Sequence, residues 1–149
     1  TLSNSHRCSI LAAFSRTTHV EMHIPVGTEW VVDASGCRAD ALRDRELLTR
    51  LMMRAVGELG LTLAAEPVWH VFPGPGGVTG MALLTESHLV CHTYPEHAAA
   101  TFNLYCCRER PEWPWRERLA EALGASEVVV RRLDRTALVG DEWLEVVDR

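Results

Sequence analysis

The sequence predicts an α+β fold, a two-layer α/β sandwich in which helices cover one face of a largely antiparallel sheet. Two segments with helical spacing of apolar residues lie among several short, apolar, strand-like segments. Short loops join most of the strand-like segments, and connections of this length favour antiparallel pairing. The 149 residues suit a single domain, and the 47% of hydrophobic residues can form its core.

The N-terminal part of the chain is predicted to hold a tail and two strands. We divide the chain into a tail of unknown role, residues 1–17, and one domain, residues 18–149. Residues 18–24 alternate between polar and apolar side chains and predict a strand. Residues 25–28 are expected to turn, and residues 29–35 to form the second strand.

The clearest helix is predicted over residues 41–60. Asp40 is the expected N-cap, and Gly60 is a good C-terminal stop. Apolar side chains recur at helical spacing along this segment. They are Leu47, Leu48, Leu51, Met52, Ala55, Val56 and Leu59.

Three strands are predicted in the middle of the chain. The first covers residues 61–72, with an interruption at Pro67, and the proline-glycine stretch 73–77 follows as a loop. Residues 78–86 and 98–107 predict the other two strands.

The C-terminal part is predicted to add a helix and a strand. The helix covers residues 114–124, because Pro114 suits a first turn and Gly124 suits a helix end. Residues 127–135 predict a further strand, and the last residues could supply one more.

Composition and charge restrict the class of partner. The formal net charge is −5 and no basic stripe is present, so we expect a small molecule or another protein and no nucleic acid. No apolar run approaches the ~18 residues of a membrane span, so we expect no membrane partner. The five cysteines are an odd number and include no C-x-x-C pair. They predict reduced thiols in a cytoplasmic protein.

One stretch, TESHLVCHTYPE at residues 85–96, concentrates reactive side chains between two apolar runs. A serine-histidine hydrolase is one interpretation of Ser87, although no G-x-S-x-G turn is present. A metal site at His88 and His92 is a second, although residues four apart in a strand lie ~13 Å apart. A polar turn whose side chains are satisfied by hydrogen bonds is the third, and the stretch taken alone favours it.

The stretch is accompanied by further matching segments. G-V-T-G at residues 77–80, E-S-H-L-V-C-H-T-Y-P-E at 86–96 and Cys107 together resemble the S-adenosylmethionine decarboxylase proenzyme family, in its short bacterial and archaeal, pyruvoyl-dependent type. The segment W-H-V-F at 69–72 and the first predicted helix are similar to that family as well. The resemblance covers about residues 27–135, and it supports the α/β sandwich.

The resemblance implies autocatalytic cleavage of a proenzyme between Glu86 and Ser87. The Ser87 Oγ attacks the carbonyl of Glu86, β-elimination breaks the resulting ester, and a pyruvoyl group remains in place of the serine. Decarboxylation of an amino acid leaves electrons on its Cα, so an electron sink is needed. The pyruvoyl ketone supplies this sink through a Schiff base with the substrate amine, so neither an external cofactor nor a metal is expected.

The resemblance also assigns roles to individual residues. Ser87, His92 and Cys107 are the expected catalytic residues, with Cys107 as the proton donor. Glu86, Ser87, Thr79 and His92 are the expected processing residues; His92 takes the proton that drives elimination. The expected substrate-binding residues, which match the ribose-binding glutamate and the adenine-stacking aromatic residue of the family, are Glu96 and Phe72.

Strand parity agrees with the choice between the two adjacent thiols. In a strand over TFNLYCC, Cys107 shares a polar face with Asn103 and Tyr105, whereas Cys106 shares a core face with Phe102. Cys106 is therefore expected to be a small buried residue.

Several positions depart from the family pattern, among them Tyr105 and Cys106, where relatives often carry phenylalanine and threonine. Glu29 stands where relatives usually carry histidine, and Asn103 stands where aspartate is common. The resemblance further implies a homodimer of cleaved protomers, with sites at or near the subunit interface.

The expected activity is decarboxylation of S-adenosylmethionine to the aminopropyl donor for polyamine synthesis. Two alternatives stay open: the same chemistry on ornithine or arginine, and an uncleaved, non-enzymatic homologue that acts as a binding or regulatory partner. Phe72 and Glu96 argue against the first alternative. Ser87, His92 and Cys107 argue against the second.

Overall fold

The computed structural model describes residues 22–139. Residues 24–137 form one compact unit, which holds every side chain discussed below. The predicted tail, residues 1–17, lies outside the described residues, as do residues 18–21 and any strand after residue 139.

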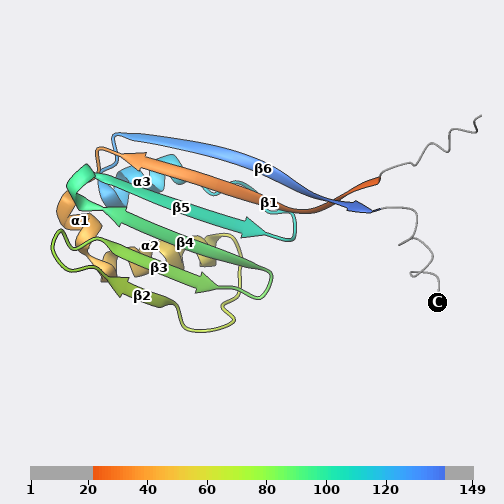
Figure 1. The fold of residues 1–149 in the computed structure, drawn as a ribbon, viewed down its shortest axis with the longest axis horizontal. Coiled ribbons are helices and arrows are strands. Elements are labelled where there is room, and N and C mark those ends of the chain that lie inside the picture. Colours follow the sequence, from red (N-terminus) through yellow and green to blue (C-terminus); the bar gives the residue numbers. More distant parts are fainter. Residues whose placement is uncertain (1–21, 140–149) are drawn as a thin grey trace, which may run out of the picture. The chain divides into compact units, whose positions relative to one another are not determined.

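The core of the fold is a six-stranded sheet with the strand order β2-β3-β4-β5-β1-β6 (Figure 1). The neighbouring strands pair in the antiparallel direction. The short 3-10 helix η1 (Pro95–His97) joins β4 to β5. The strands are β1 (Met22–Ser35), β2 (Val68–Val71), β3 (Val78–Leu83), β4 (Ser87–Tyr94), β5 (Ala99–Cys106) and β6 (Glu127–Val139).

Three helices lie on one face of this sheet, behind it in Figure 1. They are α1 (Ala39–Arg43), α2 (Arg45–Glu58) and α3 (Trp115–Leu123). This arrangement confirms the predicted α+β sandwich. α3 ends at Gly124, whose φ of 72° is the left-handed conformation that favours glycine.

The two faces of the sheet differ in burial because successive side chains of a strand point to opposite sides. On the helix side, side chains such as Leu89, Cys91 and Leu104 are at most 1% exposed and form the core with the helices. We call the other surface the open face, because no helix covers it within the described residues. Its side chains include Val31, Thr79, Met81, Leu83, His88, Val90, His92 and Asn103.

The prediction of a turn at residues 25–28 is wrong, because β1 runs through these residues as one strand. Pairing of β1 with β5 begins only at Thr28, so Pro25 removes no hydrogen bond from that ladder. Gly27 also allows β1 to stay extended here, because a Cβ at this position would lie 2.6 Å from the carbonyl oxygen of Cys106. Only glycine allows the two strands to approach this closely here.

The predicted single helix over residues 41–60 is divided in two at Asp44. The Asp44 carboxylate accepts a hydrogen bond of 2.9 Å from the backbone N–H of Leu47 and caps α2. The predicted cap, Asp40, lies instead in the first turn of α1. The predicted stop is confirmed, since α2 ends at Glu58, just before Gly60.

Two further predictions of strands need correction. Residues 61–72 contain only the short strand β2 and an isolated bridge between Leu63 and Leu84, because Pro67 interrupts pairing. Residues 87–94, which one of the three interpretations made a polar turn, are a complete strand, β4. His88 and His92 point to the open face, and the buried Thr93 hydroxyl accepts a hydrogen bond from the Val78 N–H and donates one to the Leu42 carbonyl oxygen.

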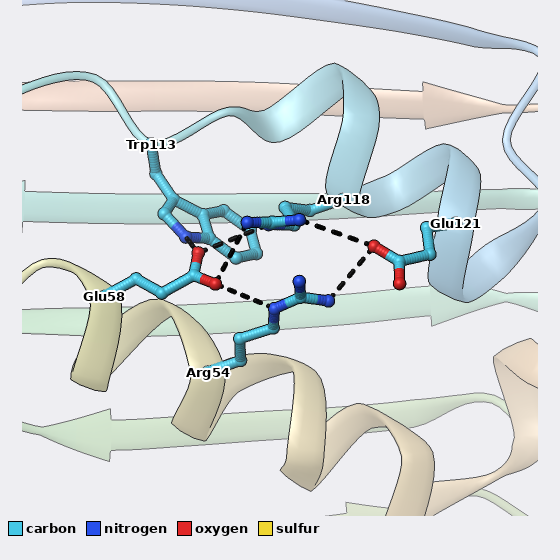
Figure 2. A network of polar contacts seen from close by, with 5 residues as sticks. All are labelled: Arg54, Glu58, Trp113, Arg118 and Glu121. Carbon is cyan, nitrogen blue, oxygen red and sulfur yellow. Dashed lines mark hydrogen bonds and ion pairs between the residues drawn. The ribbon is translucent and has the colours of Figure 1, made fainter.

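A network of charged side chains joins α2 to α3 on the outer surface (Figure 2). The Glu58 carboxylate accepts hydrogen bonds from Arg54 Nε at 2.9 Å, Trp113 Nε1 at 2.7 Å and Arg118 Nη2 at 3.0 Å. Arg54 also contacts Glu121 at 3.1 Å. These donors, Arg54 above all, hold the pKa of Glu58 below its ordinary value.

We predict that Glu58→Gln lowers the melting temperature by a few degrees at pH 7. Because the folded-state pKa is depressed, this stabilisation is fully present above the ordinary glutamate pKa of about 4.3. It is lost as the pH falls through the lower folded-state pKa. Thermal unfolding of both proteins between pH 2 and pH 7 checks the prediction. Glu66→Gln, in an exposed loop, is the matched control, and a difference for Glu58→Gln that persists at pH 2 would contradict it.

Candidate active site

Ser87 occupies the first position of β4, directly after a tight turn from β3. The turn is closed by a hydrogen bond of 3.0 Å from the Leu84 N–H to the Ser87 carbonyl oxygen. The Ser87 side chain is buried on the helix side, and its Oγ has no nitrogen or oxygen partner. Buried hydroxyl groups are almost always hydrogen-bonded, so this one requires an explanation, and a reactive role is one.

The backbone next to Ser87 is held by the following strand. The carbonyl oxygen of Glu86 accepts a hydrogen bond of 3.0 Å from the backbone N–H of Cys107. This donor polarises the carbonyl group and would stabilise negative charge on its oxygen if Ser87 Oγ attacked the carbon. The residues present at this end of β4 therefore fit the chemistry that would convert a serine to a pyruvoyl group.

The two adjacent thiols have different surroundings. Cys106 is buried and lies directly opposite Ser87 in the register of β4 and β5. Burial raises the pKa of its thiol, and contact with the Ser87 hydroxyl partly offsets that rise. Cys107 is exposed and lines a separate cavity of about 320 Å³ together with Thr28. The expectation that Cys106 faces the core is confirmed, but its position opposite Ser87 was missed.

Two arginines at this end of the sheet were also missed by sequence reasoning. Arg108 Nη2 and Arg110 Nη2 lie 2.8 Å and 3.7 Å from the Glu86 carboxylate. All three residues line a polar cavity of about 240 Å³ with Ser87. Arginines spaced i and i+2 in a short loop carry no recognisable signal, because their common partner depends on the β4–β5 register.

The other predicted residues gather at the opposite end of the sheet. Phe72, Thr79, His92 and Glu96 all line one cavity of about 260 Å³, which we call the His92 cavity. Thr79 and His92 face each other across β3 and β4, with Thr79 Oγ1 and His92 Nδ1 2.8 Å apart. Phe72 is 48% exposed, so its ring is available to a ligand.

The predicted residues therefore form two groups in one chain. His92 lies five positions after Ser87 in β4, which corresponds to ~16 Å at the usual rise of a strand. The two side chains also point to opposite faces of the sheet. His92 cannot take a proton from residue 87 of its own chain in this arrangement.

A third polar cluster occupies the open face, and it contains Glu29 and Asn103, two of the residues that depart from the family pattern. Asn103 Nδ2 donates to Glu29 Oε1 at 2.7 Å, and Asn103 Oδ1 lies 3.1 Å from His88 Nε2. Arg135 of β6 forms an ion pair with Glu29. The hydrogen bond from Asn103 and the charge of Arg135 hold the pKa of Glu29 below its ordinary value. The four side chains thus satisfy one another.

Other kinds of site receive no support from the described part of the chain. Residues 22–139 contain no group of three histidine, cysteine or acidic side chains placed to hold a metal ion. No helix within the same residues combines the length and the apolar character needed to cross a membrane.

The fold is an α+β sandwich, and the residues at the Ser87 end fit the chemistry of self-cleavage. A family model described as S-adenosylmethionine decarboxylase matches residues 28–136. The chain therefore belongs to the S-adenosylmethionine decarboxylase family.

Individual relatives carry two different names. The S-adenosylmethionine decarboxylase proenzyme of Caldicellulosiruptor saccharolyticus is 31% identical over 112 residues, which cover 74% of this chain and 88% of that protein. The arginine decarboxylase proenzyme of Aeropyrum pernix is 35% identical over 103 residues, or 68% of this chain and 77% of that protein. The crystal structure of the adenosylmethionine decarboxylase from Aquifex aeolicus matches with a TM-score of 0.63 and 28% identity. That match covers 74% of this chain and 91% of the other.

We predict that iodoacetamide modifies Cys107 at least ~10-fold faster than Cys91 in the native protein. Burial raises the pKa of Cys91 to about 12, so almost none of it is the reactive thiolate at neutral pH. Peptide mass spectrometry of a Cys8→Ser protein, sampled over time, measures both rates. The denatured protein is the control, since its thiols should react alike, and equal rates in the native protein would contradict the prediction.

Proposed function

We propose that this chain is a self-processing S-adenosylmethionine decarboxylase that produces the aminopropyl donor for polyamine synthesis. One observation carries the proposal. The buried Ser87 Oγ has no nitrogen or oxygen partner, and it lies beside a carbonyl group that already accepts a backbone hydrogen bond from Cys107. Membership of the family supports the same reading.

Self-cleavage would begin at the bond between Glu86 and Ser87. Attack of Ser87 Oγ on the Glu86 carbonyl carbon forms a new C–O bond, and the C–N bond to Ser87 then breaks. The hydroxyl proton is lost and the released nitrogen gains one, so the product is an ester with a free amine. The Cys107 N–H supports this step, because it donates to the oxygen on which negative charge develops.

The pyruvoyl group derived from Ser87 would supply an electron sink for decarboxylation without an external cofactor. The chain's own residues would then control protons. The Cys107 thiol is accessible and suits a donor to the substrate Cα. The contact between Thr79 and His92 would hold the imidazole ring of His92 in one orientation, so that the ring can act as a base during self-cleavage.

The His92 cavity supports recognition of a nucleoside. Phe72 offers an aromatic face for a base or a sulfonium cation, and Glu96 offers a carboxylate for two ribose hydroxyl groups. At about 260 Å³ the cavity is slightly smaller than usual ligand pockets, so part of the substrate would lie outside it.

We further propose that the site is completed by a second copy of the chain. A two-fold axis that crosses the strands between two facing open faces reverses the direction of the partner's strands. The start of β4 in one protomer then lies near the end of β4 in the other. The open-face side of the residue 87 backbone in one chain would then lie near Thr79, His92 and Glu96 of its partner, while the Ser87 side chain points to the helix side.

Exposed apolar side chains on the open face support such a dimer. Met81 is 49% exposed and Leu83 is 56% exposed, and Val90 lies beside Met81 in the register. A monomer that left this surface in water would expose an apolar patch of the kind that usually marks an interface. The ion pairs of the open face, such as that between Asp33 and Arg131, would also be covered.

A second substrate deserves a direct comparison, because the relative from Aeropyrum pernix is named an arginine decarboxylase proenzyme. Arginine has neither ribose nor adenine, so it would leave Glu96 and Phe72 without their proposed partners. We therefore place S-adenosylmethionine first.

We also propose a cytoplasmic location. The four cysteines among the described residues, Cys37, Cys91, Cys106 and Cys107, are free thiols, as is usual in a reducing compartment.

We predict that the purified protein releases carbon dioxide from S-adenosylmethionine, and that it releases carbon dioxide from arginine at least ~100-fold more slowly. A site built to bind ribose hydroxyl groups rejects a substrate without them, because its own polar groups then stay unpaired. Ser87→Ala should abolish release from either substrate, since no pyruvoyl group can form. Labelled carbon dioxide measured from both substrates provides the test. Ser3→Ala is the matched control for the loss of a hydroxyl group. Release by Ser87→Ala at the wild-type rate would overturn the proposal.

Mixing two inactive variants tests the shared site. Ser87→Ala retains the His92 cavity, and His92→Ala retains the Ser87 end, so a mixed dimer contains one complete site. Co-expression at equal levels should cleave roughly half of the His92→Ala chains and none of the Ser87→Ala chains. Each variant alone should stay uncut. Mass spectrometry distinguishes the two chains, and a mixture without cleavage would contradict the shared site.

A further inference from the structure

We propose that Arg108 and Arg110 promote self-cleavage by stabilising the carboxylate that leaves from Glu86 during β-elimination. This inference rests on the proposed function and concerns its second chemical step. Both arginines are positioning and charge-stabilising residues in this account, since they act on the leaving group and do not transfer a proton.

The two arginines are held close to the bond that would be cleaved. They follow β5 directly, and the Cys107 N–H anchors the start of their loop on the Glu86 carbonyl oxygen at 3.0 Å. Arg108 and Arg110 then contact the Glu86 side chain at 2.8 Å and 3.7 Å. The same residue therefore has its carbonyl group bound by one part of the loop and its side chain bound by another.

The charges of Glu86, Arg108 and Arg110 suit a reaction that adds one negative charge. The Glu86 side chain carries one negative charge and the arginines carry two positive charges, so the group has a net charge of +1 before cleavage. Elimination creates a second carboxylate on the same residue, which brings the net charge to zero. The Arg108 side chain is 72% exposed, whereas those of Arg110 and Glu86 are 29% and 30% exposed, so solvent screens the charge of Arg108 more than that of Arg110.

The cavity next to these residues can accommodate the product. It measures about 240 Å³, and the threonines Thr62 and Thr85 line it together with both arginines. Their hydroxyl groups are hydrogen-bond donors for a carboxylate, and an arginine can bind one through two parallel N–H groups. A newly formed carboxylate therefore has partners within reach on the side of the cavity.

The chemical step can be written with its atoms balanced. A base removes the Cα proton of residue 87 from the ester, and the electron pair forms a double bond between Cα and Cβ. The bond from Cβ to Oγ breaks, and Oγ leaves as part of the Glu86 α-carboxylate. The resulting dehydroalanine takes up water and loses ammonia to give the pyruvoyl group. No oxidation or reduction occurs: the base keeps the Cα proton, and the carboxylate beside the arginines carries the new negative charge.

A purely structural role predicts a different outcome. Ion pairs that are exposed to this extent contribute little to folding stability. Loss of the arginines should therefore leave the melting temperature nearly unchanged while it slows elimination. The preceding ester step should be affected much less, because its oxyanion is held by the Cys107 backbone.

The test follows processing of newly synthesised chains over time by denaturing mass spectrometry, with and without hydroxylamine, which cuts the ester but not the amide. We compare wild-type protein with Arg108→Gln/Arg110→Gln and with Arg108→Lys/Arg110→Lys, which keeps the charge. Arg116→Gln, on the exposed surface of α3, is the matched control. We expect the glutamine variant to accumulate the hydroxylamine-sensitive ester and to form fragments at least ~10-fold more slowly, as for a lost charge-stabilising donor.

The outcomes separate this inference from the proposed function. Recovery of most of the rate in the lysine variant, with an unchanged melting temperature, would support the role of charge. If the glutamine variant forms fragments at the wild-type rate, the inference is overturned and the proposed function stays intact. A slow glutamine variant with neither ester accumulation nor lysine rescue would also overturn it. A wild-type chain that forms neither ester nor fragments would overturn both.

Discussion

The register between β4 and β5 is the constraint on which the rest of the site depends. It places Ser87 opposite Cys106 and continues past the strand ends into the hydrogen bond from Cys107 N–H to the Glu86 carbonyl oxygen. A slip of one residue would turn Ser87 to the open face and remove the donor from the carbonyl. The buried apolar residues of β4, Leu89 and Cys91, prevent such a slip, because it would place both in solvent. Ordinary core packing thus fixes the geometry of a reactive backbone bond.

The same strand also separates Ser87 from the His92 cavity. Because β4 runs from Ser87 at one end to the His92 cavity at the other, the strand that aligns the first group keeps the second at a distance of ~16 Å. The proposed two-fold dimer would resolve this separation, since it would reverse the strands of one protomer over those of the other. It would also cover Met81 and Leu83, which no helix covers in the described part of the chain. The arginines at the Ser87 end need no partner, because they contact Glu86 within their own chain.

Much of the fold could be predicted because local signals agree with tertiary structure. The apolar spacing of α2, the stops at Gly60 and Gly124, and the alternation that buries Cys106 all have this property. Two predictions failed for different reasons. β1 stays extended through Pro25 because its pairing with β5, a long-range contact, begins further on. The helix is divided by a local contact, since the Asp44 carboxylate caps α2 at a point where apolar spacing alone would continue the helix.

The candidate site shows the same limit. The resemblance selected Phe72, Thr79, His92 and Glu96, and these four residues line one cavity, but no sequence pattern indicates its distance from Ser87. The grouping of Arg108 and Arg110 on Glu86 was likewise not predictable, because it exists only once β4 and β5 are paired. The most direct test of the account is the intact mass of the purified chain under denaturing conditions. We expect two fragments divided after Glu86, the second of which begins with a pyruvoyl group and has no free amine. A single chain of full mass that remains uncut over days would contradict the central claim.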